Sequence, residues 1–230
     1  MAATGLTVAA ILVAAGSGQR LNAGVPKAFC VVRGRTLLEH AHERFAGHPS
    51  IRDVIVVAPA ERLDAARALT GSTVVAGGAT RQVSVAAGMA VLDPDVTAVL
   101  VHDVARAFAP VAVIDRVVAA LCDGADAVIP VRPVTDTIKR VDEARRVMHT
   151  VDRSTLVAVQ TPQGFRRHVL EAAHRAAPAS EATDDAGLVE ASGGTVVVVD
   201  GADESFKITR PWDLVLAEAV AAQVNIAWDP

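Results

Sequence analysis

The sequence predicts an α/β fold, with an open, mostly parallel sheet that carries helices on both faces. Two observations lead to this prediction. Short runs rich in Val and Ile alternate along the chain with segments whose apolar residues recur every three or four positions, which is the pattern of buried strands alternating with amphipathic helices. In addition, 51% of the 230 residues are hydrophobic, so the chain can bury a substantial core. We expect one domain over residues 1–230.

Each expected strand and helix has its own segment in this alternation. The strand pattern occurs at residues 8–14, 53–58, 73–76, 98–101, 125–131 and 195–200. The helical pattern occurs at residues 61–69, 81–92, 111–121, 169–176, 184–191 and 212–223. Right-handed crossovers between such strands place helices over both faces of a Rossmann-like sheet.

Residues 133–153 depart from this alternation. Polar and apolar residues alternate there around an Asp142-Glu143-Ala144 turn, and the segment is rich in Lys and Arg. We interpret it as a protruding β-hairpin arm. Because an isolated two-stranded hairpin is marginally stable in water, we expect the arm to pack against another surface, most economically that of a second subunit.

The composition excludes several classes of function. A net charge of −4 and an aromatic content of 3%, with no Tyr, argue against a nucleic-acid-binding protein. Cys30 and Cys122 are far apart and form no C-x-x-C motif, so we expect neither a disulfide framework nor a thiolate zinc site. This favours a protein of the reducing cytoplasm. The longest apolar run, residues 8–15, is far shorter than the roughly 20 residues of a membrane-spanning helix. No Lys or Arg precedes it, so we do not interpret it as a secretory signal.

The segment after the first predicted strand is the first candidate site, because ligands of open α/β sheets bind beyond the carboxyl ends of strands. Its sequence is Ala14-Ala15-Gly16-Ser17-Gly18-Gln19-Arg20-Leu21. Leu21 rules out the dinucleotide fingerprint G-x-G-x-x-G, and no lysine follows a glycine as a Walker A loop requires. What remains is a glycine loop with Arg20 and, further on, Lys27, two cations that suit a polyphosphate. The alternative is a plain turn with two solvated surface cations.

Two further turns follow predicted strands. Asp103 can hold a hard cation such as Mg²⁺ together with triphosphate oxygens, or it can serve as a loop or helix cap. Gly77-Gly78, followed by Arg81 and Ser84, could contact a base or sugar, although a plain turn is the simpler interpretation. Residues 161–164 have the composition of a turn, residues 183–185 that of a helix N-cap, and Lys207 is interpreted as a surface lysine.

Several short motifs occur in order over nearly the whole chain. They are the loop at residues 14–20, Pro26-Lys27, the segment 102–106, Asp136-Thr137-Ile138-Lys139, Val151-Asp152-Arg153, Thr161-Pro162-Gln163 and Lys207-Ile208-Thr209. As a set they resemble the 2-C-methyl-D-erythritol 4-phosphate cytidylyltransferase family of the nucleotidyltransferase superfamily. The resemblance implies that CTP and methylerythritol phosphate give 4-diphosphocytidyl-2-C-methyl-D-erythritol and pyrophosphate, a step of the non-mevalonate isoprenoid pathway.

The resemblance also implies a role for each motif. The implied catalytic residues are Arg20, Lys27, Arg153 and Lys207. The implied nucleotide-binding residues are Ala14, Ala15, Gly16, Gly18, Gly78, Ser84 and Asp103, and Asp103 is also the implied ligand of Mg²⁺. The implied residues for the second substrate are Arg106, Thr137, Arg153, Thr161 and Lys207. The hairpin arm would cross into a neighbouring subunit, so that Thr137 and Arg153 would serve the partner's site in a homodimer.

Two other functions stay open on the sequence. One is a cytidylyltransferase for another polyol phosphate, such as ribitol 5-phosphate, which would share the nucleotide half of the site. The other is a nucleotide-binding protein without catalysis, although the presence of Arg20, Lys27, Asp103 and Lys207 together argues against it.

Overall fold

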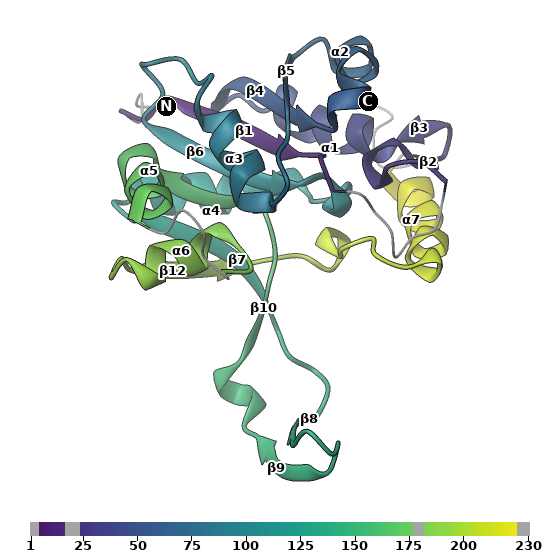
Figure 1. Ribbon diagram of the computed structural model, residues 1–230, viewed down its shortest axis with the longest axis vertical. Coiled ribbons are helices and arrows are strands. Elements are labelled where there is room, and N and C mark those ends of the chain that lie inside the picture. The colour runs from purple at the N-terminus through teal and green to yellow at the C-terminus, as the bar shows by residue number, and fades with distance from the viewer. Residues whose placement is uncertain (1–4, 17–23, 177–181, 225–230) are drawn as a thin grey trace.

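The central element is an eight-stranded sheet with the order β10-β7-β11-β6-β1-β4-β5 and with β12 paired to β7. The computed structural model describes residues 5–16, 24–176 and 182–224 of the chain (Figure 1). The strands are β1 (Val8–Val13), β4 (Ile51–Ala58), β5 (Thr73–Ala76), β6 (Ala98–Asp103), β7 (Ala127–Pro133), β10 (Val157–Val159), β11 (Gln163–Arg166) and β12 (Val196–Asp200). All six predicted strands are present, with ends shifted by a few residues.

The sheet has a parallel half and an antiparallel insertion. Strands β6, β1, β4 and β5 are parallel neighbours, and β12 is parallel to β7. Between them, β11 pairs antiparallel with both β6 and β7, and β10 pairs antiparallel with β7. The interpretation of residues 161–164 as a turn is therefore wrong for Gln163 and Gly164, which begin β11. Their strand conformation depends on hydrogen bonds to β6 and β7, which no local pattern indicates.

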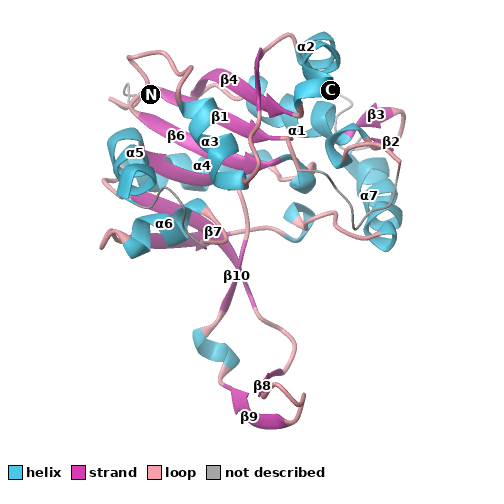
Figure 2. Ribbon diagram, in the orientation of Figure 1, coloured by secondary structure: helices cyan, strands magenta, loops and turns pink. Residues whose placement is uncertain are grey.

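Helices cover both faces of the sheet (Figure 2). They are α1 (Leu37–Ala46), α2 (Leu63–Thr70), α3 (Arg81–Met89), α4 (Val111–Cys122), α5 (Arg167–Ala176), α6 (Asp185–Ala191) and α7 (Pro211–Val224). Helix α1 was not among the helices predicted from the sequence, although Thr36 and Glu39 form a capping box at its start. A small hairpin of β2 (Val31–Val32) and β3 (Arg35–Thr36) precedes it.

Two hydrophobic cores lie on opposite faces of the sheet, as the alternation within β1 illustrates. Ala10 and Leu12 belong to the core shared with α1, α4 and α7, whereas Ala9 and Ile11 belong to the core shared with α3, α5 and α6. Both sets are fully buried. The strand is therefore apolar throughout because each of its faces is covered by helices.

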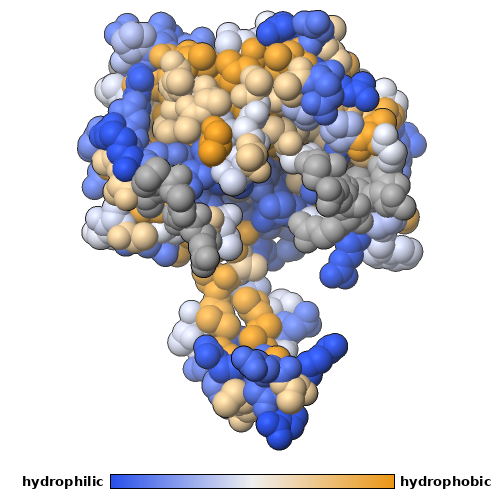
Figure 3. All heavy atoms as spheres, viewed as in Figure 1, coloured by the Kyte–Doolittle hydropathy of each residue, from blue (hydrophilic) through white to orange (hydrophobic). Residues whose placement is uncertain are grey.

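The predicted arm is present and projects from the body (Figure 1). Its hairpin consists of β8 (Ile138–Val141) and β9 (Val147–Val151), which pair antiparallel only with each other. Apolar residues gather on the part of the arm next to the body, and hydrophilic residues occupy its tip (Figure 3). Among the exposed side chains of the arm are Val141, Val147 and Met148. The hairpin thus leaves apolar surface uncovered in a single copy of the chain.

Within the described ranges, no helix combines the length and the apolar character needed to cross a lipid bilayer.

Candidate active site

A cavity of about 780 Å³ lies at the carboxyl ends of the parallel strands. Its lining comes from the end of β1 and the loop that follows it, the 3₁₀ turn that begins at Lys27, the turn after β5 with the start of α3, the end of β6 with the residues after it, and the segment before α7. The lining includes Ala14, Ala15, Gly16, Lys27, Gly78, Arg81, Ser84, Asp103 and Lys207. Eight of these nine are residues that the sequence analysis assigned to nucleotide binding or catalysis, and the structure brings them together. Gly18 and Arg20 lie outside the described residues.

The turn after β5 packs directly against the loop after β1. A Cβ atom at Gly77 would lie 2.3 Å from the Cβ of Ala15, so only glycine permits this approach. The Ser84 Oγ accepts a hydrogen bond from the Gly78 N–H at 3.1 Å and donates to the Thr80 carbonyl at 2.9 Å. The buried Ser84 hydroxyl therefore fixes the shape of the Gly78 turn where that turn faces the cavity.

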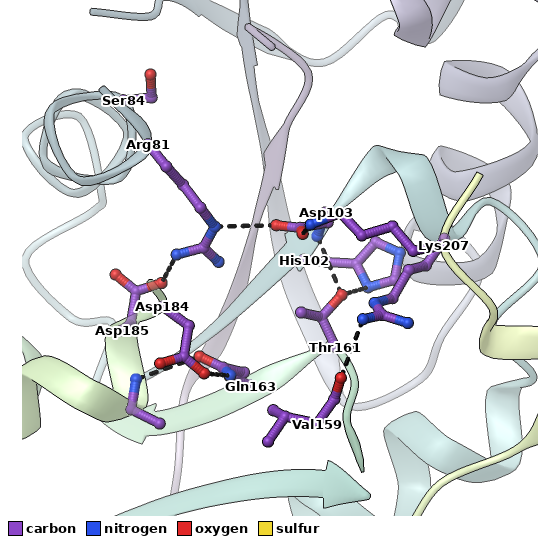
Figure 4. Close-up of polar contacts among 12 residues, drawn as sticks. Arg81, Ser84, His102, Asp103, Val159, Thr161, Gln163, Asp184, Asp185 and Lys207 are labelled. Atoms are coloured by element: carbon purple, nitrogen blue, oxygen red, sulfur yellow. Dashed lines mark hydrogen bonds and ion pairs between the residues drawn. The ribbon is translucent and has the colours of Figure 1, made fainter. Parts of the chain in front are cut away.

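Asp103 lies between two cations in the cavity (Figure 4). Its Oδ1 accepts from the Arg81 Nε at 3.0 Å, and its Oδ2 accepts from the Lys207 Nζ at 2.7 Å. Burial by itself would raise the pKa of Asp103, but Arg81 and Lys207 outweigh it and hold that pKa well below its usual range. Asp103 is therefore a fully ionised carboxylate at neutral pH. Lys207, interpreted as a surface lysine, is exposed, with 42% of its side chain accessible, and it is also the ion-pair partner of Asp103.

The main chain of Asp103 is fixed by Thr161 and His102. The Thr161 Oγ1 accepts from the Asp103 N–H at 3.1 Å and is also hydrogen-bonded to the His102 Nδ1, 3.0 Å away. Both side chains are buried. Burial lowers the pKa of His102 to about 4, which keeps the imidazole neutral. The Thr161 hydroxyl thus has two partners within the protein.

Arg106 connects two segments next to the cavity without lining it. Its guanidinium donates to the Ser205 carbonyl at 2.7 Å and to the Val159 carbonyl at 3.0 Å. Ser205 belongs to the segment that leads to Lys207, and Val159 ends the strand that returns from the arm. Arg106 therefore links the base of the arm to the segment that carries Lys207.

Thr137 and Arg153 are placed apart from the other predicted site residues. Both are exposed on the arm, and neither lines the 780 Å³ cavity of its own chain. The Arg153 guanidinium donates to the Thr135 carbonyl and borders a second cavity of about 470 Å³ at the base of the arm. Their distance from the first cavity is the arrangement expected if the arm reaches a neighbouring subunit.

No pattern in the sequence indicated that Arg81, Asp185 and His174 form a connected group at the site. Arg81 was noted only as part of a turn, but it pairs with both Asp103 and Asp185, and Asp185 also binds His174. The predicted N-cap next to them is confirmed, since the Asp184 carboxylate accepts from the Gly187 N–H at 3.0 Å. An N-cap motif explains the first of two consecutive aspartates and gives no reason for the second.

Comparison with known proteins gives consistent matches over almost the whole chain. The family model for 2-C-methyl-D-erythritol 4-phosphate cytidylyltransferase matches residues 8–223. The enzyme of that name from Saccharopolyspora erythraea is 50% identical over 225 residues, covering 94% of this chain and all of the relative. The crystal structure of that enzyme from Thermus thermophilus is 39% identical, has a TM-score of 0.79 and covers 94% of this chain and 100% of that one. A 4-diphosphocytidyl-2C-methyl-D-erythritol synthase structure from Anaerococcus prevotii has a TM-score of 0.84 at 31% identity, covering 95% and 97%.

Proposed function

The chain belongs to the 2-C-methyl-D-erythritol 4-phosphate cytidylyltransferase family, and from this premise we propose which of its residues carry out the reaction. The enzyme transfers the cytidylyl group of CTP to 2-C-methyl-D-erythritol 4-phosphate, giving 4-diphosphocytidyl-2-C-methyl-D-erythritol and pyrophosphate in isoprenoid biosynthesis. The observation that carries the assignment of roles is the cavity that Lys27, Asp103 and Lys207 line together with the Gly78 turn.

The chemical step joins two phosphate groups. A phosphate oxygen of the acceptor forms a bond to the α-phosphorus of CTP, and the bond from that phosphorus to the oxygen of the β-phosphate breaks, so that pyrophosphate leaves. Negative charge accumulates around the α-phosphorus in the transition state. Lys27, at the start of the 3₁₀ turn Lys27–Phe29, lines the cavity and would stabilise this charge together with Arg20.

The nucleotide would be recognised mainly by backbone groups. We assign the cytidine to Ala14, Ala15, Gly16 and Gly78, which line the cavity, and to Gly18 of the same loop, because glycine lets a base or phosphate approach the main chain closely. Ser84 would act by shaping the Gly78 turn, in keeping with its two hydrogen bonds to that turn.

The residues present fit a Mg²⁺ ion shared with the nucleotide. Asp103 offers an ionised carboxylate in the cavity, the oxygen donor that Mg²⁺ prefers. Among the described residues, no three His, Cys, Asp or Glu side chains converge, so phosphate oxygens and water would supply the other ligands. When bound, Mg²⁺ would neutralise triphosphate charge and favour the departure of pyrophosphate.

The acceptor would be oriented from both subunits of a homodimer. Lys207 supplies an ammonium group beside Asp103, Arg106 supports the segment that carries it, and Thr161 fixes the Asp103 backbone. Thr137 and Arg153 would come from the partner's arm, whose exposed apolar side chains the dimer would cover. We expect the enzyme to work in the cytoplasm as one domain per chain.

The test is pyrophosphate release by the purified protein with CTP, Mg²⁺ and methylerythritol phosphate, leaving out each component in turn. The proposal requires release only when all three are present. A clear preference for ribitol 5-phosphate in a parallel assay would move the acceptor to another polyol phosphate. CTP binding without pyrophosphate release would make the protein a nucleotide-binding protein without catalysis.

A further inference from the structure

A buried aspartate at the start of α6 is bonded to the active-site network. Asp185 is fully buried, and both of its carboxylate oxygens are used. Oδ2 accepts from the Arg81 guanidinium at 2.5 Å (Figure 4), and Oδ1 accepts from the His174 Nε2 at 2.9 Å. The N-cap of α6 is the preceding residue, Asp184. Asp185 is therefore not needed to cap its helix, and a buried carboxylate is costly unless it has a specific partner.

Arg81 connects this carboxylate to the cavity. Its Nε donates to the Asp103 Oδ1 at 3.0 Å, while a terminal nitrogen of the same guanidinium binds Asp185. The planar guanidinium is thus held at two points, which a point-charge ammonium could not reproduce. The remaining terminal nitrogen of the Arg81 guanidinium, Nη2, is buried without a hydrogen-bond partner in the part of the chain that the structure describes. Arg81 also lines the cavity.

The charges along this chain of contacts are balanced. Asp185, Arg81, Asp103 and Lys207 alternate in sign, and each contact between neighbours is an ion pair. Removing the charge of Asp185 would leave Arg81 with Asp103 as its carboxylate partner. The guanidinium would then be free to turn and cover both oxygens of Asp103, which is the geometry that arginine prefers with a carboxylate.

We propose that Asp185 is a positioning residue for cytidylyl transfer: it holds Arg81 in the orientation that binds only Oδ1 of Asp103 and leaves Oδ2 directed to Lys207 and the substrates. This inference rests on the function proposed for Asp103. His174 assists by binding the second oxygen of Asp185 and so fixing the carboxylate plane. The role is distinct from packing, because it acts through one guanidinium on one carboxylate in the cavity.

The first test is Asp185→Asn, with Asp184→Asn as the matched control. Asp184 lies on the same helix end and makes comparable bonds, but to the Gln163 Nε2 at 2.6 Å and the Gly187 N–H at 3.0 Å. We expect Asp185→Asn to lower kcat by about ten- to a hundredfold, as loss of a group that orients an active-site residue typically does. Calorimetry should show weaker binding of CTP with Mg²⁺, because the Asp103 oxygen proposed for the metal ion would be covered by Arg81. Asp184→Asn should retain the parent kcat and CTP affinity.

The second test separates positioning from structural support. In an Arg81→Lys background, which keeps the charge but lacks the planar fork that holds Asp103 and Asp185 in a fixed geometry, Asp185→Asn should cause no further loss of kcat. The proposal is overturned if Asp185→Asn lowers kcat by the same factor in the Arg81→Lys background as in the parent. It is also overturned if Asp185→Asn lowers the melting temperature while kcat stays at the parent value. Should Asp185→Asn fail to fold, Arg81→Lys by itself decides: a parent-like kcat overturns the proposal. An inactive parent would instead count against the proposed function.

Discussion

Replacing Thr161 by Val removes one hydroxyl at the point where the Asp103 backbone is fixed. The Asp103 N–H would lose its acceptor in a partly buried environment, and the His102 Nδ1 would lose its hydrogen-bond partner in a fully buried one. A buried polar group left without a partner costs about 1–3 kcal/mol, so the two together should lower the free energy of unfolding by roughly 2–6 kcal/mol. Thr161→Ser keeps the hydroxyl and removes one methyl group, which should lower the free energy of unfolding by about 1 kcal/mol.

Urea denaturation of the parent and both variants measures this difference. We also expect kcat to fall in Thr161→Val, because the Asp103 carboxylate moves with its backbone. The kcat of Thr161→Ser should stay near that of the parent. Equal unfolding free energies for the Val and Ser variants would refute the reasoning. If Thr161 instead contacts the acceptor directly through its hydroxyl, Val should raise the acceptor KM and leave the unfolding free energy close to that of Ser.

Three further outcomes are expected. Lys27→Ala should lower kcat about a hundredfold with little change in melting temperature, and an unchanged kcat in a steady-state assay would contradict its role. Chains with Lys27→Ala and with Arg153→Ala, each nearly inactive, should regain activity when mixed under conditions of proven subunit exchange; no recovery would mean that the arm does not complete the partner's site. Because burial lowers the pKa of His102 from 6.5 to about 4, the unfolded state binds the proton first, so the free energy of unfolding should fall by up to about 3 kcal/mol as the pH falls from 6.5 through 4. In a denaturation series over that range, His102→Gln should remove this part of the pH dependence, and an unchanged slope would contradict it.

The alternation of apolar runs was sufficient to predict the parallel half of the sheet. Strands such as β1 are apolar on both faces because helices cover both, so each appears in the sequence as a continuous apolar run. The strand β11 has no such run: it has four residues, includes Gly164 and is defined by pairing with β6 and β7. Its antiparallel direction follows from the path of the chain back from the arm, which is a tertiary property. By contrast, α1 carried a capping box that could have been recognised.

The site shows the same division between local and tertiary information. The rule that ligands bind at the carboxyl ends of strands indicated the loop at Ala14 and the segment at Asp103, and both line one cavity. The Gly78 turn, for which a plain turn was the simpler interpretation, lines the same cavity. The ion pair between Arg81 and Asp185 joins residues 104 positions apart, and neither residue type nor spacing indicates it. The same holds for Lys207 and Asp103, whose contact also spans 104 positions.

The most direct test of the proposed site is a crystal structure of the protein with CTP and Mg²⁺. The cytosine should lie against the Gly78 turn, and the triphosphate should lie between Lys27 and Asp103, with the metal ion bound to an Asp103 oxygen. A nucleotide bound outside this cavity, or one whose phosphates point away from Asp103 and Lys27, would contradict the assignment of the site.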